Sequence, residues 1–123
     1  MTGNSLLLDT NTVLYLLAGD ETLAEFLNDK KLYISIISEL ELLGYNKLTT
    51  KDIKALKIFI EELQVENISE EIKNITIDIR RRTKLKLPDC IIAATAIALE
   101  IPLLSADTGL KNIADLDLII YEK

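Results

Sequence analysis

The sequence contains no histidine and a single cysteine, Cys90. Without histidine, the chain cannot use Ser-His or Cys-His catalysis, and it has no histidine ligand for zinc or haem. One cysteine cannot form an internal disulfide, so Cys90 is most simply a small buried residue. Any chemistry must therefore come from carboxylates, hydroxyls, amides, lysine or a bound metal ion.

The sequence also lacks an apolar run long enough to cross a membrane. Its longest run, from Cys90 to Leu99, is interrupted by Thr95 and is shorter than the roughly 20 residues that span a bilayer. No secretory signal pattern opens the chain, so we expect no membrane association and a cytoplasmic location. With 123 residues, 49% hydrophobic and 28% charged, the chain has the size and composition of one folded domain.

Positive charge is scarce overall but concentrated in one place. The net charge of −6 argues against indiscriminate binding to polyanions, because such binding depends on Lys and Arg. Five of the 14 basic residues nevertheless lie within seven positions: Arg80, Arg81, Arg82, Lys84 and Lys86. This clustering predicts one basic stripe on an otherwise acidic protein.

Apolar periodicity predicts strands that alternate with helices. We expect strands over residues 5–8, 32–35, 65–68, 103–106 and 118–121. A helix is expected directly after the first strand, stopping at Gly19, and others over 21–27, 36–43, 50–63, 72–83 (opened by Ser69), 90–100 (opened by Leu87-Pro88-Asp89) and, as a short turn, 108–113. The fold class is therefore α/β, a single domain over 1–123 with a mainly parallel central sheet flanked by helices.

Two aspartates, Asp9 and Asp107, each follow an apolar strand directly. Because the carboxyl ends of parallel strands lie at one edge of a sheet, both carboxylates would face one cleft there. Each aspartate also precedes a helix, and aspartate is among the best N-cap residues. Both interpretations stay open.

Two further acids lie at positions unusual for surface charge. Glu41 is in an apolar helix with no Lys or Arg within four residues, and an unpaired acid near a buried face is costly unless it is protonated, hydrogen-bonded or metal-bound. Alternatively, Glu41 and Glu39 share a solvated face. Asp89 opens the most apolar helix, although the helix dipole alone favours an acid there by about 0.3–1 kcal/mol.

Taken together, four acids without an obvious cationic partner indicate a bound cation. An oxygen-only site selects hard ions such as Mg²⁺ or Mn²⁺, which serve phosphoryl chemistry. Thr10 and Asn11 beside Asp9, and Ser105 before Asp107, either orient these carboxylates and hold metal-bound water or make ordinary turn and cap hydrogen bonds.

Four segments resemble, in order, the motifs of the PIN-domain ribonucleases, in particular the VapC-type toxins of toxin–antitoxin pairs: Leu7–Leu14, Ile34–Gly44, Leu87–Ala96 and Leu103–Asp107. The resemblance spans nearly the whole chain. It implies a PIN-like domain that hydrolyses RNA phosphodiester bonds with Mg²⁺ or Mn²⁺. It also implies a homodimer and an antitoxin partner. The metal-binding catalytic residues it implies are Asp9, Glu41, Asp89 and Asp107, supported by Asn11 and Ser105.

Under this resemblance the basic stripe, residues 80–86, has two possible roles. Immediately before Asp89, it can guide the RNA backbone toward the metal site. It can equally be a solvated helix face that pairs with Glu70, Glu71 or Asp78.

Three other functions compete with a ribonuclease. A receiver-type phosphoacceptor domain needs an aspartate after a middle strand, and none ends the strand over 32–35. A haloacid-dehalogenase-like phosphatase needs a second aspartate where Asn11 stands. The strongest competitor is a catalytically silent PIN-fold module that only binds RNA or protein.

Overall fold

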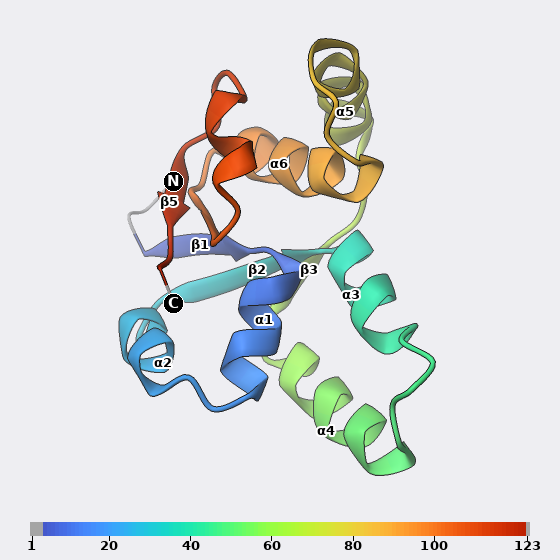
Figure 1. The fold of residues 1–123 in the computed structure, drawn as a ribbon, viewed down its shortest axis with the longest axis vertical. Coiled ribbons are helices and arrows are strands. Elements are labelled where there is room, and N and C mark those ends of the chain that lie inside the picture. Colours follow the sequence, from blue (N-terminus) through green and yellow to red (C-terminus); the bar gives the residue numbers. More distant parts are fainter. Residues whose placement is uncertain (1–3, 123) are drawn as a thin grey trace.

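The structure, a computed structural model, describes residues 4–122 and contains a parallel sheet covered by helices on both faces (Figure 1). The strands are β1 (Ser5–Leu8), β2 (Lys31–Ser35), β3 (Gln64–Glu66), β4 (Leu103–Ser105) and β5 (Leu118–Ile120). Their order is β3-β2-β1-β4-β5, and every adjacent pair is parallel. The predicted α/β class is therefore confirmed.

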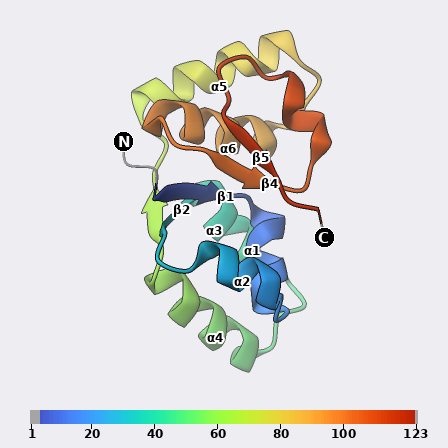
Figure 2. The same ribbon diagram turned by 90° about the vertical axis from the view of Figure 1, so that its left-hand side faces the viewer.

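The helices divide between the two faces of the sheet. They are α1 (Thr10–Leu17), α2 (Glu21–Leu27), α3 (Ile36–Leu43), α4 (Thr50–Glu61), α5 (Glu70–Arg82), α6 (Leu87–Leu99) and the 3₁₀ helix η1 (Thr108–Asn112). Helices α5 and α6 lie on one side, and α1, α2 and α4 lie on the other (Figures 1 and 2). None of the helices within residues 4–122 is long and apolar enough to cross a membrane.

Strands β1, β2, β4 and β5 each contribute to two hydrophobic cores, because successive side chains of a strand point to opposite faces. Leu7 and Leu103 pack in the core beneath α5 and α6, whereas Leu8 and Leu104 pack in the core against the other helices. Helix α6 is apolar nearly all round because it packs against both α5 and the sheet. Its Cys90 is fully buried, which agrees with a packing role.

Two elements end two residues before the expected position, and several other element ends differ by one residue. Helix α4 ends at Glu61 rather than at residue 63, and the chain then enters β3 directly at Gln64. Strand β3 ends at Glu66 rather than at residue 68, because Glu66 pairs with Ser35, the last residue of β2. Beyond that pair, β3 has no partner strand to continue the ladder.

The sheet order places β1 where the chain reverses direction across the sheet. The chain steps from β1 to β2 and β3 on one side, and β4 and β5 lie on the other side. In open α/β sheets, ligands bind at the carboxyl ends of the strands at such a switch point. Asp9 follows β1, and Asp107 lies just beyond the end of the adjacent β4.

Candidate active site

Asp9 combines the two roles that its sequence position suggested. It is the N-cap of α1, and its Oδ1 accepts hydrogen bonds from the Thr12 backbone N–H (2.9 Å) and the Thr12 hydroxyl (2.6 Å). Its Oδ2 accepts a hydrogen bond from Ser105 Oγ. Asp9 is buried with 9% exposure, so these bonds hold its carboxylate in one orientation at the edge of the sheet.

Ser105 connects Asp9 to Asp107. It is the last residue of β4, it is fully buried, and besides donating to Asp9 its hydroxyl accepts a hydrogen bond from the Asp107 backbone N–H (3.0 Å). Asp107 is an exposed N-cap of η1, and its Oδ1 accepts from the Gly109 N–H (2.8 Å). The N-cap interpretation therefore holds for Asp107 as well.

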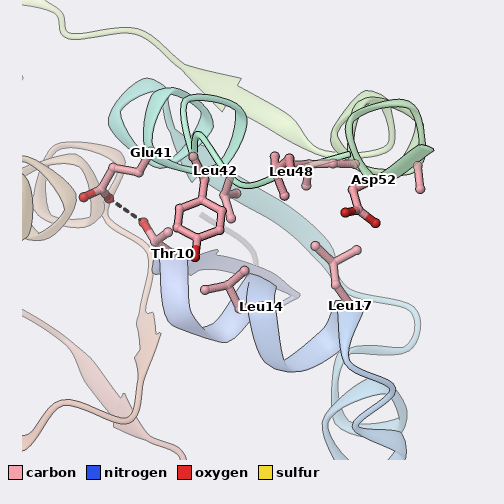
Figure 3. Close-up of a pocket in the computed structure, with 10 residues that line it drawn as sticks. Thr10, Leu14, Leu17, Glu41, Leu42, Leu48 and Asp52 are labelled. Carbon is pink, nitrogen blue, oxygen red and sulfur yellow. Dashed lines mark hydrogen bonds between the residues drawn. The ribbon is translucent and has the colours of Figure 1, made fainter. Parts of the chain in front are cut away.

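Glu41 is an exposed residue of α3 whose side chain reaches α1. Its Oε1 accepts a hydrogen bond from Thr10 Oγ1 at 2.8 Å, drawn as a dashed line in Figure 3. Thr10 Oγ1 also lies 2.9 Å from the fully buried hydroxyl of Ser38, one turn before Glu41 on α3. Glu41 is therefore solvated, as one interpretation held, but it is fixed across the gap between two helices.

Asp89, in the first turn of α6, lies close enough to the other three acids to be affected by their charge. Burial raises the pKa of Asp89 above its ordinary value, and the negative charges of Asp107, Glu41 and Asp9 raise that pKa further. Lys86 lowers it. Carboxylates from three other segments thus act electrostatically on the Asp89 carboxyl group.

A cleft of about 170 Å³ joins these segments, and it is lined by Asp9, Thr10, Asn11, Glu41, Asp89 and Ile92. The structure thus brings together three of the four expected acids in one cleft, with Asn11 beside them. Asp107 is outside the lining, although its charge acts on Asp89.

The side chains do not form the metal cage that the sequence suggested. Among residues 4–122, no three Asp, Glu or Cys side chains are arranged so that they could hold a metal ion. Asp9, Glu41 and Asp107 instead accept hydrogen bonds from the protein. The donor chemistry nevertheless fits a hard cation, because every donor is an oxygen. Neither ion pair between the described residues, Lys73–Glu70 or Arg82–Asp78, neutralises the cluster.

The residues of the basic stripe differ in their contacts. Arg80 Nη1 donates to the Leu85 carbonyl at 2.6 Å, and Arg82 Nε donates to Asp78 at 3.1 Å, as the solvated-face interpretation expected. The expected pairs with Glu70 and Glu71 do not form within the described chain, and Glu70 pairs with Lys73. Three exposed basic residues make no ion pair with any residue in 4–122: Arg81, Lys84 and Lys86.

Sequence reasoning gave little weight to three hydroxyl residues that hold the acids, namely Thr10, Thr12 and Ser38. Ser38 lies three residues before Glu41, so the two share a helix face, and this spacing was a usable signal. Thr12 lies three residues after Asp9, which is the usual distance for a side-chain N-cap bond. The Thr10–Glu41 bond depends on how α1 packs against α3, and sequence spacing carries no signal for it.

An apolar groove borders the site at Thr10 and Glu41. It has a volume of about 650 Å³ and runs between α1, α3 and α4 (Figure 3). Glu41 lies at one end and Asp52 at the other, and the walls are lined by Leu14, Leu17, Leu42, Tyr45, Leu48, Ala55 and Leu56. No Lys or Arg lines this groove.

Residues 6–116 match the family model described as the PIN domain. The chain belongs to the PIN-domain family. This match excludes the receiver and dehalogenase interpretations, and the observed strand order also differs from the 2-1-3-4-5 order of flavodoxin-like folds.

Three solved structures illustrate the similarity of this PIN domain. It shares 27% identity with a chain of a toxin–antitoxin complex from Klebsiella pneumoniae, with a TM-score of 0.81, covering 96% of this chain and 99% of that one. FitAcB from Neisseria gonorrhoeae gives 25% identity, a TM-score of 0.77, and coverage of 93% and 96%. DNA-bound VapBC from Salmonella typhimurium gives 21% identity, a TM-score of 0.86, and coverage of 94% and 97%. A comparison with curated protein sequences gives no match.

Proposed function

We propose that this PIN domain is a metal-dependent endoribonuclease and the toxin of a type II toxin–antitoxin pair. The observation that carries the proposal is the cleft that brings together Asp9, Glu41 and Asp89, with no ion pair from the described residues to balance them. The structures described as toxin–antitoxin or VapBC complexes support the biological setting. RNA is the substrate that the resemblance to PIN-domain ribonucleases implies.

In this proposal Asp9, Glu41, Asp89 and Asp107 would hold Mg²⁺ or Mn²⁺ at the carboxyl edge of β1 and β4 once their side chains turn toward a common ion. When bound, such an ion activates water and stabilises negative charge on the attacking and leaving oxygens of a phosphodiester. The protein's part is to orient the ligands: Thr12 and Ser105 fix Asp9, and Thr10 fixes Glu41. Asn11, exposed beside them in the cleft, can contact the substrate.

An antitoxin is the partner that we propose for the apolar groove. Leu14, Leu17 and Tyr45 expose 47%, 43% and 56% of their surface, which is high for large apolar residues that line a concave surface. Glu41 and Asp52 at its ends favour a segment with basic residues flanking apolar ones. A segment bound in this groove would reach the cleft at Glu41 and so block the active site.

A second copy of the chain is the other proposed partner. Helices α3, α5 and α6 each expose a large apolar residue: Leu40 (59%), Ile77 (47%) and Leu87 (51%). Burying these side chains in a homodimer would remove apolar surface from water. Light scattering, which measures the mass in solution, tests whether the chain forms a homodimer. The cytoplasmic location stays a prediction.

Cleavage assays on a panel of structured RNAs with Mn²⁺ test the enzymatic proposal. We expect wild-type protein to cut RNA, and Asp89→Asn and Glu41→Gln to lose at least about 100-fold in rate, as when a group that stabilises the transition state is removed. Glu39→Gln is the matched control, since Glu39 lies on the same helix but outside the cleft, and it should cut normally. RNA binding without cleavage by wild type would favour the catalytically silent module.

A further inference from the structure

A cleft between the end of α5 and η1 lies beside the acidic site. Its lining comes from residues 82–85 on one side and from Gly109, Asn112 and Ile113 on the other. Its volume is about 400 Å³, which is within the roughly 300–1,000 Å³ of typical ligand sites. Arg82 and Lys84 supply positive charge, and no acidic residue lines the cleft.

This cleft adjoins the candidate active site through Asp107. Gly109, which lines the cleft, donates its backbone N–H to Asp107 Oδ1 at 2.8 Å. On the opposite wall, the connection that carries Lys84 continues to Lys86, the N-cap of α6, and Asp89 lies in the first turn of that helix. The end of α5 and the segment after β4 lie at the same end of the molecule (Figure 2). One wall of the cleft is therefore bonded to Asp107, and the other continues along the chain to Asp89.

The cations of the cleft are available to a ligand. Lys84 is exposed and makes no hydrogen bond or ion pair with any residue in 4–122. Arg82 uses only its Nε–H for Asp78, and a guanidinium carries five N–H donors, so four remain. Arg80 differs, because its bond to the Leu85 carbonyl supports the connection between the helices. Arg82 and Lys84 thus provide unused donors of the kind that bind phosphate.

The apolar groove between α1, α3 and α4 has the opposite charge to the cleft between α5 and η1. Glu41 and Asp52 line it, and no Lys or Arg does, so a polyanion would be repelled there. Nucleic-acid backbones are held mainly by neutralising phosphates with Lys and Arg. We infer that the RNA strand runs from the acidic cleft past Asp107 into the cleft between α5 and η1, with a backbone phosphate on Lys84 and Arg82. The inference rests on the proposed ribonuclease function.

The salt dependence of RNA binding tests this path. The measurement uses fluorescence anisotropy of a labelled single-stranded RNA, with Mg²⁺ present and with Asp89→Asn in every protein to prevent cleavage. Lys84→Gln should weaken binding about fivefold at low salt and lower the log–log salt slope by about 0.7, the value for one lost single-strand phosphate contact. Asn112→Asp, which puts a negative charge into the cleft, should also weaken binding.

Lys57→Gln is the matched control, because it removes the same charge from an exposed position on α4, outside this cleft. It should leave the slope unchanged. Equal slopes for Lys84→Gln and Lys57→Gln would overturn the inference, and so would an unchanged slope in Lys84→Gln, the result expected if the cleft instead binds an acidic protein segment. Failure of the ribonuclease proposal is distinct, since wild-type protein would then cut no RNA in Mn²⁺.

Discussion

Replacing Asp9 with alanine should destabilise the fold, although it removes one of several clustered negative charges. The substitution deletes the N-cap of α1, which costs about 0.5–2 kcal/mol. It also leaves the fully buried Ser105 hydroxyl without its acceptor, and a buried donor without a partner costs about 1–3 kcal/mol. Thr12 loses less, because its hydroxyl can still donate to the Leu104 carbonyl, 3.2 Å away.

Relief of repulsion among the acids offsets part of this cost, so we expect a net loss of about 2 kcal/mol. For a domain of this size, that loss lowers the melting temperature by roughly 6–10 °C. The assay is thermal and urea denaturation at pH 7 in EDTA, which removes any contribution from bound metal. Asp117→Ala, at an exposed acid outside the site, should change stability by less than about 0.5 kcal/mol.

In the same buffer, Asp89→Asn should change the folding stability in the opposite direction to Asp9→Ala. The pKa of Asp89 is higher in the folded protein than its ordinary value of 3.8, so ionised Asp89 destabilises the fold above its folded pKa. This penalty decreases as the pH falls through the folded pKa and is absent below 3.8. The variant should therefore be at least as stable as wild type at pH 7, with an advantage that shrinks toward pH 4. Equal losses of folding stability in Asp9→Ala and Asp89→Asn would refute the reasoning.

Two further predictions concern the Glu41 side of the site. Thr10→Val should weaken Mn²⁺ binding, measured by calorimetry, and should lower the melting temperature because the buried Ser38 hydroxyl loses its Thr10 partner. Thr10→Ser should retain both the Mn²⁺ affinity and the melting temperature. Equal Mn²⁺ affinities in the two variants would contradict a positioning role for Thr10. Leu14→Glu should abolish co-purification with the product of an adjacent antitoxin gene but leave RNA cleavage intact, and retained capture would exclude the groove as the docking surface.

Sequence periodicity predicted the order and type of the elements because each is encoded locally. Apolar strands, N-cap residues such as Ser69 and the Pro88 helix start are all visible within a few neighbouring positions. The positions of Asp9 and Asp107 at one edge of the sheet also followed, since parallel strands share a carboxyl edge.

Features that depend on packing between distant segments were not predictable. The partner of Glu41 comes from Thr10, 31 positions away, and is determined by the packing of α1 against α3. The basic stripe was treated as one unit, but Arg80 lies in α5 and donates to the Leu85 carbonyl, whereas Lys84 lies in the connection after α5 and lines a cleft formed with η1. The Ser105–Asp9 hydrogen bond likewise joins residues 96 positions apart and arises only in the folded chain.

The Ser105 hydroxyl has a consequence for how substitutions at the site combine. One oxygen donates to the Asp9 carboxylate and accepts from the Asp107 backbone, so it joins the chain segments that follow β1 and β4. Residues that share a partner give stability effects that do not add. Substitutions at Asp9 and Ser105 are therefore energetically coupled, and a change at either alters how the Asp107 backbone is held, whereas replacing the Asp107 side chain keeps its N–H bond to Ser105.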